Sequence, residues 1–385
     1  MSRHFIPNLC RLSDSVILNS WRIIMNHKKF FPLWLACSVI FLSCSPSSNN
    51  TQKPQPVKHK KPFNVILITD VGGRGDKGFN DAGWAGCEDA KRRLAEGGAE
   101  IGINAIESRE QTDYVDNLNL AAERADVVVA LGFLIAESVQ QTAPRHPKKS
   151  FIFIDGRIEG KNIASFDFKS QEGAYLAGIL AGYVSQTGIV SVLPGMDIPP
   201  VEAFASGYRA GVLTCGALRG MELKALSATI GSFNDPVKGK SLAQSLLGQK
   251  ADILFQLAGN SGWGVIEAVR DTPERSFVIG VDINQDDLAP GKVLTSVLKR
   301  MDQVVSDQIQ AVYNDSFHGG IFEVGLKDGY VGLTQMVHTR QFVPPEAIST
   351  LEKARTMIVN GTLKVPGTYQ ALKDFQPPVV LFRNQ

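Results

Sequence analysis

Short apolar runs alternate with longer amphipathic stretches along most of the chain after residue 62. The runs are rich in valine, isoleucine and leucine and lack polar alternation, which is typical of strands covered on both faces of a sheet. The pattern predicts strands at 65–69, 100–106, 127–131, 151–154, 189–193, 224–229, 253–257 and 277–281, with helices at 82–96, 113–124, 137–142 and 175–183. This order predicts an α/β fold with two Rossmann-like lobes, each built on a doubly wound parallel sheet.

The first strand is followed by an acidic residue, a glycine-rich loop and an aromatic residue. Asp70 ends the apolar run, and Phe79 and Asn80 follow the loop. This edge of a parallel sheet is where α/β proteins bind ligands. Residues 73–78 also match the dinucleotide pattern G-x-G-x-x-G, although three residues separate the strand from the first glycine. A glycine loop without any ligand is the remaining interpretation.

Later strands also end at residues with binding chemistry. Glu137 follows the strand at 127–131, and Gly259 and Trp263 follow the strand at 253–257. Asp282 ends the next strand, and Lys299 lies in a short strand-like crossover. Carboxylates accept hydrogen bonds, an ammonium donates them, and aromatic faces stack on planar rings. Each residue also has a purely structural interpretation, as a helix cap, a turn former, a core aromatic or a solvated lysine. No histidine lies at a predicted strand end, so no catalytic residue is expected.

The amino-terminal region has the composition of a secretory signal. Residues 25–43 combine a basic start, an apolar stretch of about 13 residues and a small residue before Cys44, an arrangement that resembles a bacterial lipobox. The apolar stretch is too short for a membrane span. We therefore expect lipidation of Cys44, with residues 44–61 as a flexible polar tether. Residues 1–24 fit no part of a signal peptide, and we interpret them as a start-site extension.

Composition narrows the function further. The chain has 385 residues, 44% of them hydrophobic and 20% charged, which suits a globular protein of two lobes. Its formal net charge is only +2, and the basic excess lies in the expected signal, which argues against a nucleic-acid partner. Cys87 and Cys215, the cysteines that follow Cys44, are far apart in the sequence and have no nearby metal-ligand partner. We expect buried free thiols, no bound metal and no cofactor.

The ordered set of motifs over about residues 62–345 resembles the basic membrane protein (BMP) family. The matching segments include Asp-Val-Gly-Gly-Arg-Gly-Asp-Lys-Gly-Phe-Asn at 70–80, Phe-Ile-Phe-Ile-Asp at 151–155, Gly-Ser-Phe-Asn-Asp at 231–235 and Ile-Gly-Val-Asp at 279–282. The family comprises lipoprotein substrate-binding components of ABC importers, including purine nucleoside receptors. The resemblance implies a periplasmic-binding-protein fold of the ribose-binding type (type I), with two lobes joined by three crossovers.

The resemblance also implies roles for residues that would surround a nucleobase. Phe79 would stack on the base, while Asp70 and Asn80 would line the base pocket. Glu137 stands where the family's base-reading aspartate is expected, with one additional methylene. Trp263 is the candidate for a second stacking aromatic residue.

The sugar side of the implied site lies in the second half of the chain. Asp282 and Lys299 would hold the ribose hydroxyls, and Gly259 would contribute backbone. The first lobe is expected at residues 62–163 with 300–318, and the second at 164–299 with 319–385.

The resemblance implies a monomeric protein without enzymatic activity. It would be lipid-anchored at a bacterial cell membrane, facing the periplasm or the exterior, and would deliver a purine nucleoside to an ABC permease. Three alternatives remain open: a binding protein for a sugar or another small ligand, a nucleoside-processing or nicotinamide-dependent enzyme, and a surface adhesin without a small ligand. The tripeptide Arg74-Gly75-Asp76 is the feature that suggests an adhesin.

Overall fold

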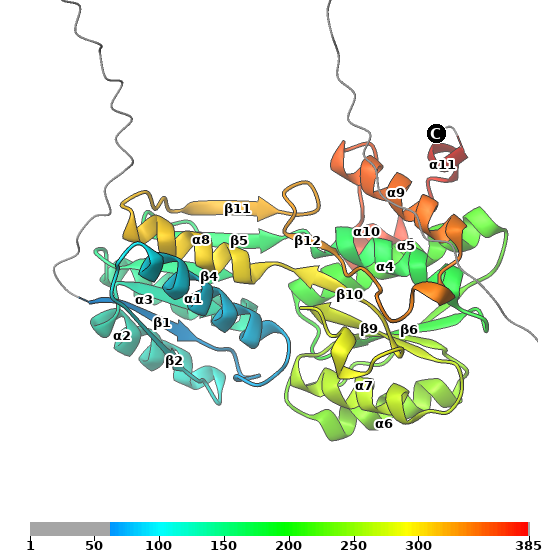
Figure 1. Ribbon diagram of the computed structural model, residues 1–385, viewed down its shortest axis with the longest axis horizontal. Coiled ribbons are helices and arrows are strands. Elements are labelled where there is room, and N and C mark those ends of the chain that lie inside the picture. The colour runs from blue at the N-terminus through cyan, green and yellow to red at the C-terminus, as the bar shows by residue number, and fades with distance from the viewer. Residues whose placement is uncertain (1–61, 384–385) are drawn as a thin grey trace, which may run out of the picture. The chain divides into compact units, whose positions relative to one another are not determined.

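The computed structural model describes residues 62–383, which fold into two α/β lobes (Figure 1). The expected start-site extension, signal, Cys44 and tether lie outside the described residues. Within residues 62–383, no helix has the length and apolar character needed to cross a membrane. Each lobe contains a six-stranded sheet, so the predicted pair of Rossmann-like lobes is confirmed.

The first lobe is organised around a parallel sheet with the strand order β11-β5-β4-β3-β1-β2. Its strands are β1 (Phe63–Ile68), β2 (Ile101–Ile106), β3 (Val127–Leu131), β4 (Ser150–Ile154), β5 (Ile163–Phe168) and β11 (Gly320–Val324). Its helices are α1 (Phe79–Glu96), α2 (Tyr114–Arg124), α3 (Ala136–Thr142) and α8 (Met301–Tyr313). Alternate residues of β1 face opposite layers: Val65 packs with the cores of α1 and α8, and Ile66 packs with those of α2 and α3.

The second lobe repeats this arrangement with the strand order β12-β10-β9-β8-β6-β7. Its strands are β6 (Ile189–Pro194), β7 (Lys224–Ser227), β8 (Ile253–Leu257), β9 (Phe277–Asp282), β10 (Val293–Lys299) and β12 (Val331–Leu333), of which β12 pairs antiparallel with β10. Its helices are α4 (Ser170–Val184), α5 (Pro199–Arg219), α6 (Pro236–Gly248), α7 (Asn260–Asp271), α9 (Pro345–Val359), α10 (Tyr369–Lys373) and α11 (Val379–Arg383). The core residues of α4, α5 and α9 cover one face of the sheet, and those of α6 and α7 cover the other.

The chain passes between the two sheets three times. The passages follow β5, follow β10, and join β11 to β12. The first sheet therefore includes β5 and β11, which the boundaries expected from sequence place almost entirely in the second lobe. Figure 1 shows the two lobes joined by these passages. Residues at the carboxyl ends of strands in both lobes line one cavity.

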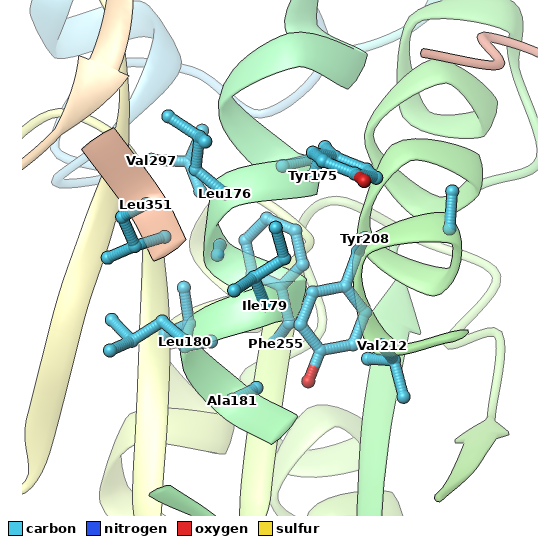
Figure 2. Packing of buried hydrophobic residues seen from close by; sticks show 14 of the residues in the cluster. Tyr175, Leu176, Ile179, Leu180, Ala181, Tyr208, Val212, Phe255, Val297 and Leu351 are labelled. Carbon is cyan, nitrogen blue, oxygen red and sulfur yellow. The ribbon is translucent and has the colours of Figure 1, made fainter. Parts of the chain in front are cut away.

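The largest core cluster lies between the sheet of the second lobe and helices α4 and α5. Figure 2 shows Tyr208 of α5 beside Phe255 of β8, and their ring centroids lie 5.1 Å apart. Tyr175 of α4 belongs to the same cluster. The two helices approach closely because glycines face the contact. A Cβ atom on Gly178 would lie 2.0 Å from the carbonyl oxygen of Tyr208. This close packing holds α4 and α5 together in the core of the second lobe.

Candidate functional site

A cavity lies at the carboxyl ends of the strands, between the two lobes. It contains about 610 Å³ of empty space, part of it continuous with solvent. The first lobe contributes Asp70, Gly72, Asp76, Phe79, Asn80, Gly132, Phe133, Leu134 and Asp155. The second lobe contributes Ile198, Pro200, Val201, Phe204, Phe233, Leu257, Ala258, Gly259, Val281, Asp282 and Lys299.

Sharp backbone turns follow four of the strands that lead to the cavity. Gly132 after β3 and Gly259 after β8 have φ values of 95° and 52°. Asp155 after β4 and Asp282 at the end of β9 have φ values of 76° and 67°, which non-glycine residues rarely adopt. Such strain persists where the surrounding structure fixes it, and it is concentrated at functional sites. The two aspartates occupy matching positions in the two lobes, because β4 and β9 are each third in the strand order of their sheet.

The glycine-rich loop folds around its own carboxylates. Asp76 accepts hydrogen bonds from the backbone amides of Gly78 and Asn80 at 3.0 and 2.9 Å, and Asp81 accepts from those of Gly75 and Lys77 at 2.8 and 2.9 Å. These amides are the groups that would bind a pyrophosphate in a dinucleotide site. Since side chains of the loop already occupy them, the dinucleotide interpretation is wrong.

The same loop fixes the amide of Asn80 at the cavity wall. Its Nδ2 atom donates to Asp70 Oδ1 at 2.8 Å and to Asp76 Oδ2 at 3.1 Å, and its Oδ1 atom accepts from the backbone amide of Asp70 at 3.2 Å. Burial raises the pKa of Asp70 to about 6, against the lowering effect of its hydrogen bonds. Asp76 is only 3% exposed, so its carboxylate is not presented to a partner surface as an adhesion tripeptide requires.

Lys299 is the cation of the cavity and is almost completely buried. It forms an ion pair with Asp155, so the end of β10 in the second lobe contacts the end of β4 in the first. Its Nζ atom lies 5.0 Å from the ring centroid of Phe79, 5.2 Å from that of Phe168 and 5.9 Å from that of Phe204. Burial raises the pKa of Asp155, and the Lys299 ammonium opposes this rise. The ion pair and the rings hold the ammonium in one place.

Asp282 is the carboxylate that the surrounding protein stabilises least. It is 8% exposed, and no side-chain hydrogen bond to it is found among the described residues. Burial raises its pKa to about 7, the Lys299 ammonium opposes the rise, and the charges of Asp155, Asp76 and Asp70 add to it. A buried carboxylate that accepts no hydrogen bond from the protein is expected to accept hydrogen bonds from a bound molecule.

Aromatic rings line the cavity from both lobes. Phe79, in the first turn of α1, belongs to the first lobe, and Phe233, in the loop between β7 and α6, belongs to the second. This loop is fixed to α7, since Ser261 donates its backbone amide to the carbonyl of Phe233 at 3.1 Å. Gly195 leaves room for the ring, because a Cβ atom there would lie 2.5 Å from Phe233.

Six of the residues expected at the site line this cavity, and two do not. Those that line it are Asp70, Phe79, Asn80, Gly259, Asp282 and Lys299. Glu137 is displaced because a 3₁₀ turn at Phe133–Ile135 precedes α3, so Phe133 and Leu134 face the cavity instead, and Glu137 accepts a hydrogen bond from Gln141. Trp263 lies one turn into α7, where it packs against the core of α6 and α7. The structure brings neither of them to the cavity.

Several cavity residues could not be assigned a role from the sequence, and Asp155 and Phe233 are the most informative of them. Asp155 ends the motif at 151–155 and Phe233 lies within the motif at 231–235, so both were within the matched segments. Their signals were the acidic residue after a buried strand and the aromatic residue in a glycine-containing loop. Among residues 62–383, no group of histidine, cysteine, aspartate and glutamate side chains has the arrangement of a metal site.

The fold and the cavity define a two-lobed solute-binding protein with a type I periplasmic-binding fold. A family model described as "ABC transporter substrate-binding protein PnrA-like" (Bmp) matches residues 63–369. The chain belongs to this family, whose members bind substrates for transport and are not enzymes.

Three similar proteins illustrate the relationship. An uncharacterised lipoprotein of Pyrococcus abyssi is 33% identical over 73% of this chain and 71% of its own length. The ABC transporter nucleoside-binding protein BmpA of Lactococcus lactis is 29% identical over 80% of this chain and 90% of its own. A crystal structure of an ABC transporter solute-binding protein from Aeropyrum pernix covers 81% of this chain and 96% of its own, with 27% identity and a TM-score of 0.75. Relatives of this chain thus include lipoproteins and transport receptors, and the family implies a small ligand and a permease partner.

Proposed function

We propose that the protein captures a purine nucleoside between its two lobes and delivers it to an ABC permease. The observation that carries the proposal is the composition of the cavity, where aromatic rings from both lobes accompany four buried carboxylates and one ammonium. A nucleoside presents a flat ring together with N–H and O–H donors, which complement this combination. The BmpA relative, named as nucleoside-binding, supports the proposal from a separate direction.

In the proposed complex, the base stacks between Phe79 and Phe233. Asp70 and Asn80 lie beside Phe79 and receive the polar edge of the base. Asp282 and Lys299 bind the ribose hydroxyls, with the backbone at Gly259 allowing close approach. The carboxylates favour a ligand rich in donors, and with Lys299 already paired to Asp155, a phosphorylated ligand would meet an excess of negative charge.

The proposed location is the outer face of a bacterial cell membrane, through a lipid on Cys44. The residues that support it precede the described part of the chain, and the lipoprotein relatives support it independently. Mass spectrometry of the protein from the native membrane tests this proposal. A lipid-modified Cys44 as the first residue supports it, and an unmodified peptide that spans residues 40–50 contradicts it.

A thermal-shift panel tests the proposed ligand. The panel contains adenosine, guanosine, inosine, uridine, the free bases, ribose, galactose and guanosine monophosphate. A ligand that binds only the folded protein raises the midpoint, and at equal concentration a tighter ligand raises it more. We expect the purine nucleosides to give the largest increases and guanosine monophosphate to give none. A larger increase of the midpoint with ribose or galactose than with any nucleoside would contradict the proposal and would indicate that the ligand is a sugar.

A further inference from the structure

We propose that three residues outside the cavity, Lys77, Gln285 and Trp263, form a latch that holds the closed lobes together and fixes the loop leading to Phe79. The inference rests on the proposed function, because it concerns how the same binding site closes. Lys77 belongs to the first lobe, and Gln285 and Trp263 belong to the second. None of the three lines the ligand cavity.

Gln285 presents a fixed hydrogen-bond donor to the opposite lobe. Its Oε1 atom accepts from Gln256 Nε2 at 2.8 Å and from the backbone amide of Val281 at 3.0 Å. Its own backbone amide donates to Ser296 Oγ at 3.0 Å. All of these partners belong to the second lobe, so they hold the side chain whether or not the lobes are closed. The remaining group, Nε2, donates to the backbone carbonyl of Lys77 at 2.8 Å.

Trp263 contacts the side-chain ammonium of Lys77, whereas Gln285 contacts its backbone carbonyl. The Lys77 ammonium lies 3.7 Å from the centroid of the Trp263 ring, within the range of a cation–π interaction. Lys77 has a φ of 50°, and its amide donates to Asp81, so its backbone conformation is set within the first lobe. Lys77 thus contacts the second lobe through both its carbonyl and its ammonium. These contacts explain why Trp263 lies near the cleft without facing the ligand.

The latch is linked to the ligand site through the chain itself. Phe79 follows Lys77 by two residues, and Asn80 follows Phe79, so a fixed Lys77 carbonyl fixes the start of α1. A ligand that touches both lobes and the latch stabilise the same closed state. Loss of the latch therefore lowers the closed population and with it the apparent affinity, although every ligand contact is retained.

Dissociation kinetics of guanosine test the latch. Lys77→Met removes the ammonium from an exposed side chain and leaves the fold intact. We expect its dissociation rate to rise by about 3- to 10-fold, because the cation–π contact stabilises the closed state, which must open before the ligand leaves. Arg74→Met is the matched control, since the Arg74 guanidinium lies 4.0 Å from the ring centroid of Trp84 within the first lobe. It should leave the rate unchanged.

A double-mutant cycle separates the latch from general loss of packing at Trp263. Because Lys77→Met and Trp263→Leu remove the same contact, the double variant should dissociate no faster than Trp263→Leu alone. Additive effects of the two substitutions on the dissociation rate would overturn the inference. So would equal effects of Lys77→Met and Arg74→Met.

Hydrogen–deuterium exchange of the ligand-free protein tests the latch without any nucleoside. Gln285→Met removes the donor to the Lys77 carbonyl, so the amides of residues 72–80 should exchange at least about 3-fold faster than in the native chain. Unchanged exchange in this segment would overturn the latch. Failure of adenosine, guanosine and inosine alike to bind the native protein would instead refute the proposed function, and the exchange result would still test the latch.

Discussion

At the scale of single residues, the charged groups of the cavity are four buried carboxylates and a single ammonium. Asp70, Asp76, Asp155 and Asp282 surround one ammonium, and burial raises the pKa of each carboxylate. Charges that the protein does not stabilise by itself are stabilised by a ligand that supplies hydrogen-bond donors. In the ligand-free protein these buried charges therefore lower the free energy of unfolding, and a ligand that donates hydrogen bonds to them raises it.

Replacement of Asp282 tests its proposed role directly. Asp282→Asn keeps the shape of the side chain but removes the charge that would accept hydrogen bonds from ribose hydroxyls. A hydrogen bond to a charged group contributes about 1.5–3 kcal/mol, so nucleoside affinity should fall by about 10- to 100-fold in calorimetric titrations. Asp287→Asn, the same change at a side chain that is 94% exposed, is the control and should bind as the native protein does. Native affinity in Asp282→Asn would refute the assigned role.

The raised pKa values also predict how stability depends on pH. The folded-state pKa of Asp282 is about 7 and that of Asp70 about 6, both above their values in the unfolded chain. As pH rises, the unfolded chain releases these protons first, so the two groups lower the free energy of unfolding between about pH 4 and pH 7. Above that range their effect is constant.

Thermal unfolding of the ligand-free protein across this pH range gives the measurement. Asp282→Asn should be more stable than the native chain, by an amount that grows from about pH 4 to about pH 7. The variant would then gain stability while it loses affinity, as is common at binding sites. A stability difference that does not change with pH would contradict the raised pKa.

At the scale of secondary-structure elements, the site depends on strand ends supported by closely packed helices. Gly178 of α4 allows the contact with α5 on which the second sheet rests. We expect Gly178→Ala to lower the free energy of unfolding by about 1–3 kcal/mol or more, because its Cβ atom would overlap backbone that cannot move freely. Chemical denaturation measures the change.

Gly248, in the last turn of α6, provides the comparison for Gly178. A Cβ atom there meets nothing within 4 Å, so Gly248→Ala should be neutral or slightly stabilising. Equal destabilisation by the two substitutions would show that helix propensity, and not the contact between α4 and α5, controls the effect.

The sequence predicted the buried parallel strands because short, continuous apolar runs are typical of strands covered on both faces of a sheet. It did not predict β5, β11 and β12. In β5 the run Ile163–Phe168 is interrupted by polar residues, and β12 has only three residues. Their pairing depends on segments distant in the sequence, such as β11 with β5, which no local pattern encodes. Strand propensity alone was therefore insufficient at the crossovers.

The residues of the site were predictable only where they end a predicted strand or open the following helix. Asp70 and Asp282 each end a continuous apolar run, so the sequence placed them at the carboxyl ends of predicted strands. Trp263 and Glu137 lie on helices, and the direction of a helical side chain depends on where the helix begins. The ion pair of Asp155 with Lys299 joins two lobes and could not be read from either segment.

At the scale of the whole described structure, the cavity at the strand ends receives groups from both lobes. Phe79 and Asp70 come from the first, and Phe233, Asp282 and Lys299 come from the second. Asp155 and Lys299 already connect the lobes at the crossovers, while Lys77 connects them at the glycine-rich loop. In the proposed complex the base and the sugar of one ligand complete these connections, so both halves of the ligand are needed for tight binding.

Calorimetric titration of the protein with guanosine, guanine and ribose tests this central claim most directly. Because the base and the sugar contact different groups, the account predicts that guanosine binds at least about 100-fold more tightly than either guanine or ribose. Ribose or guanine that binds as tightly as guanosine would contradict it.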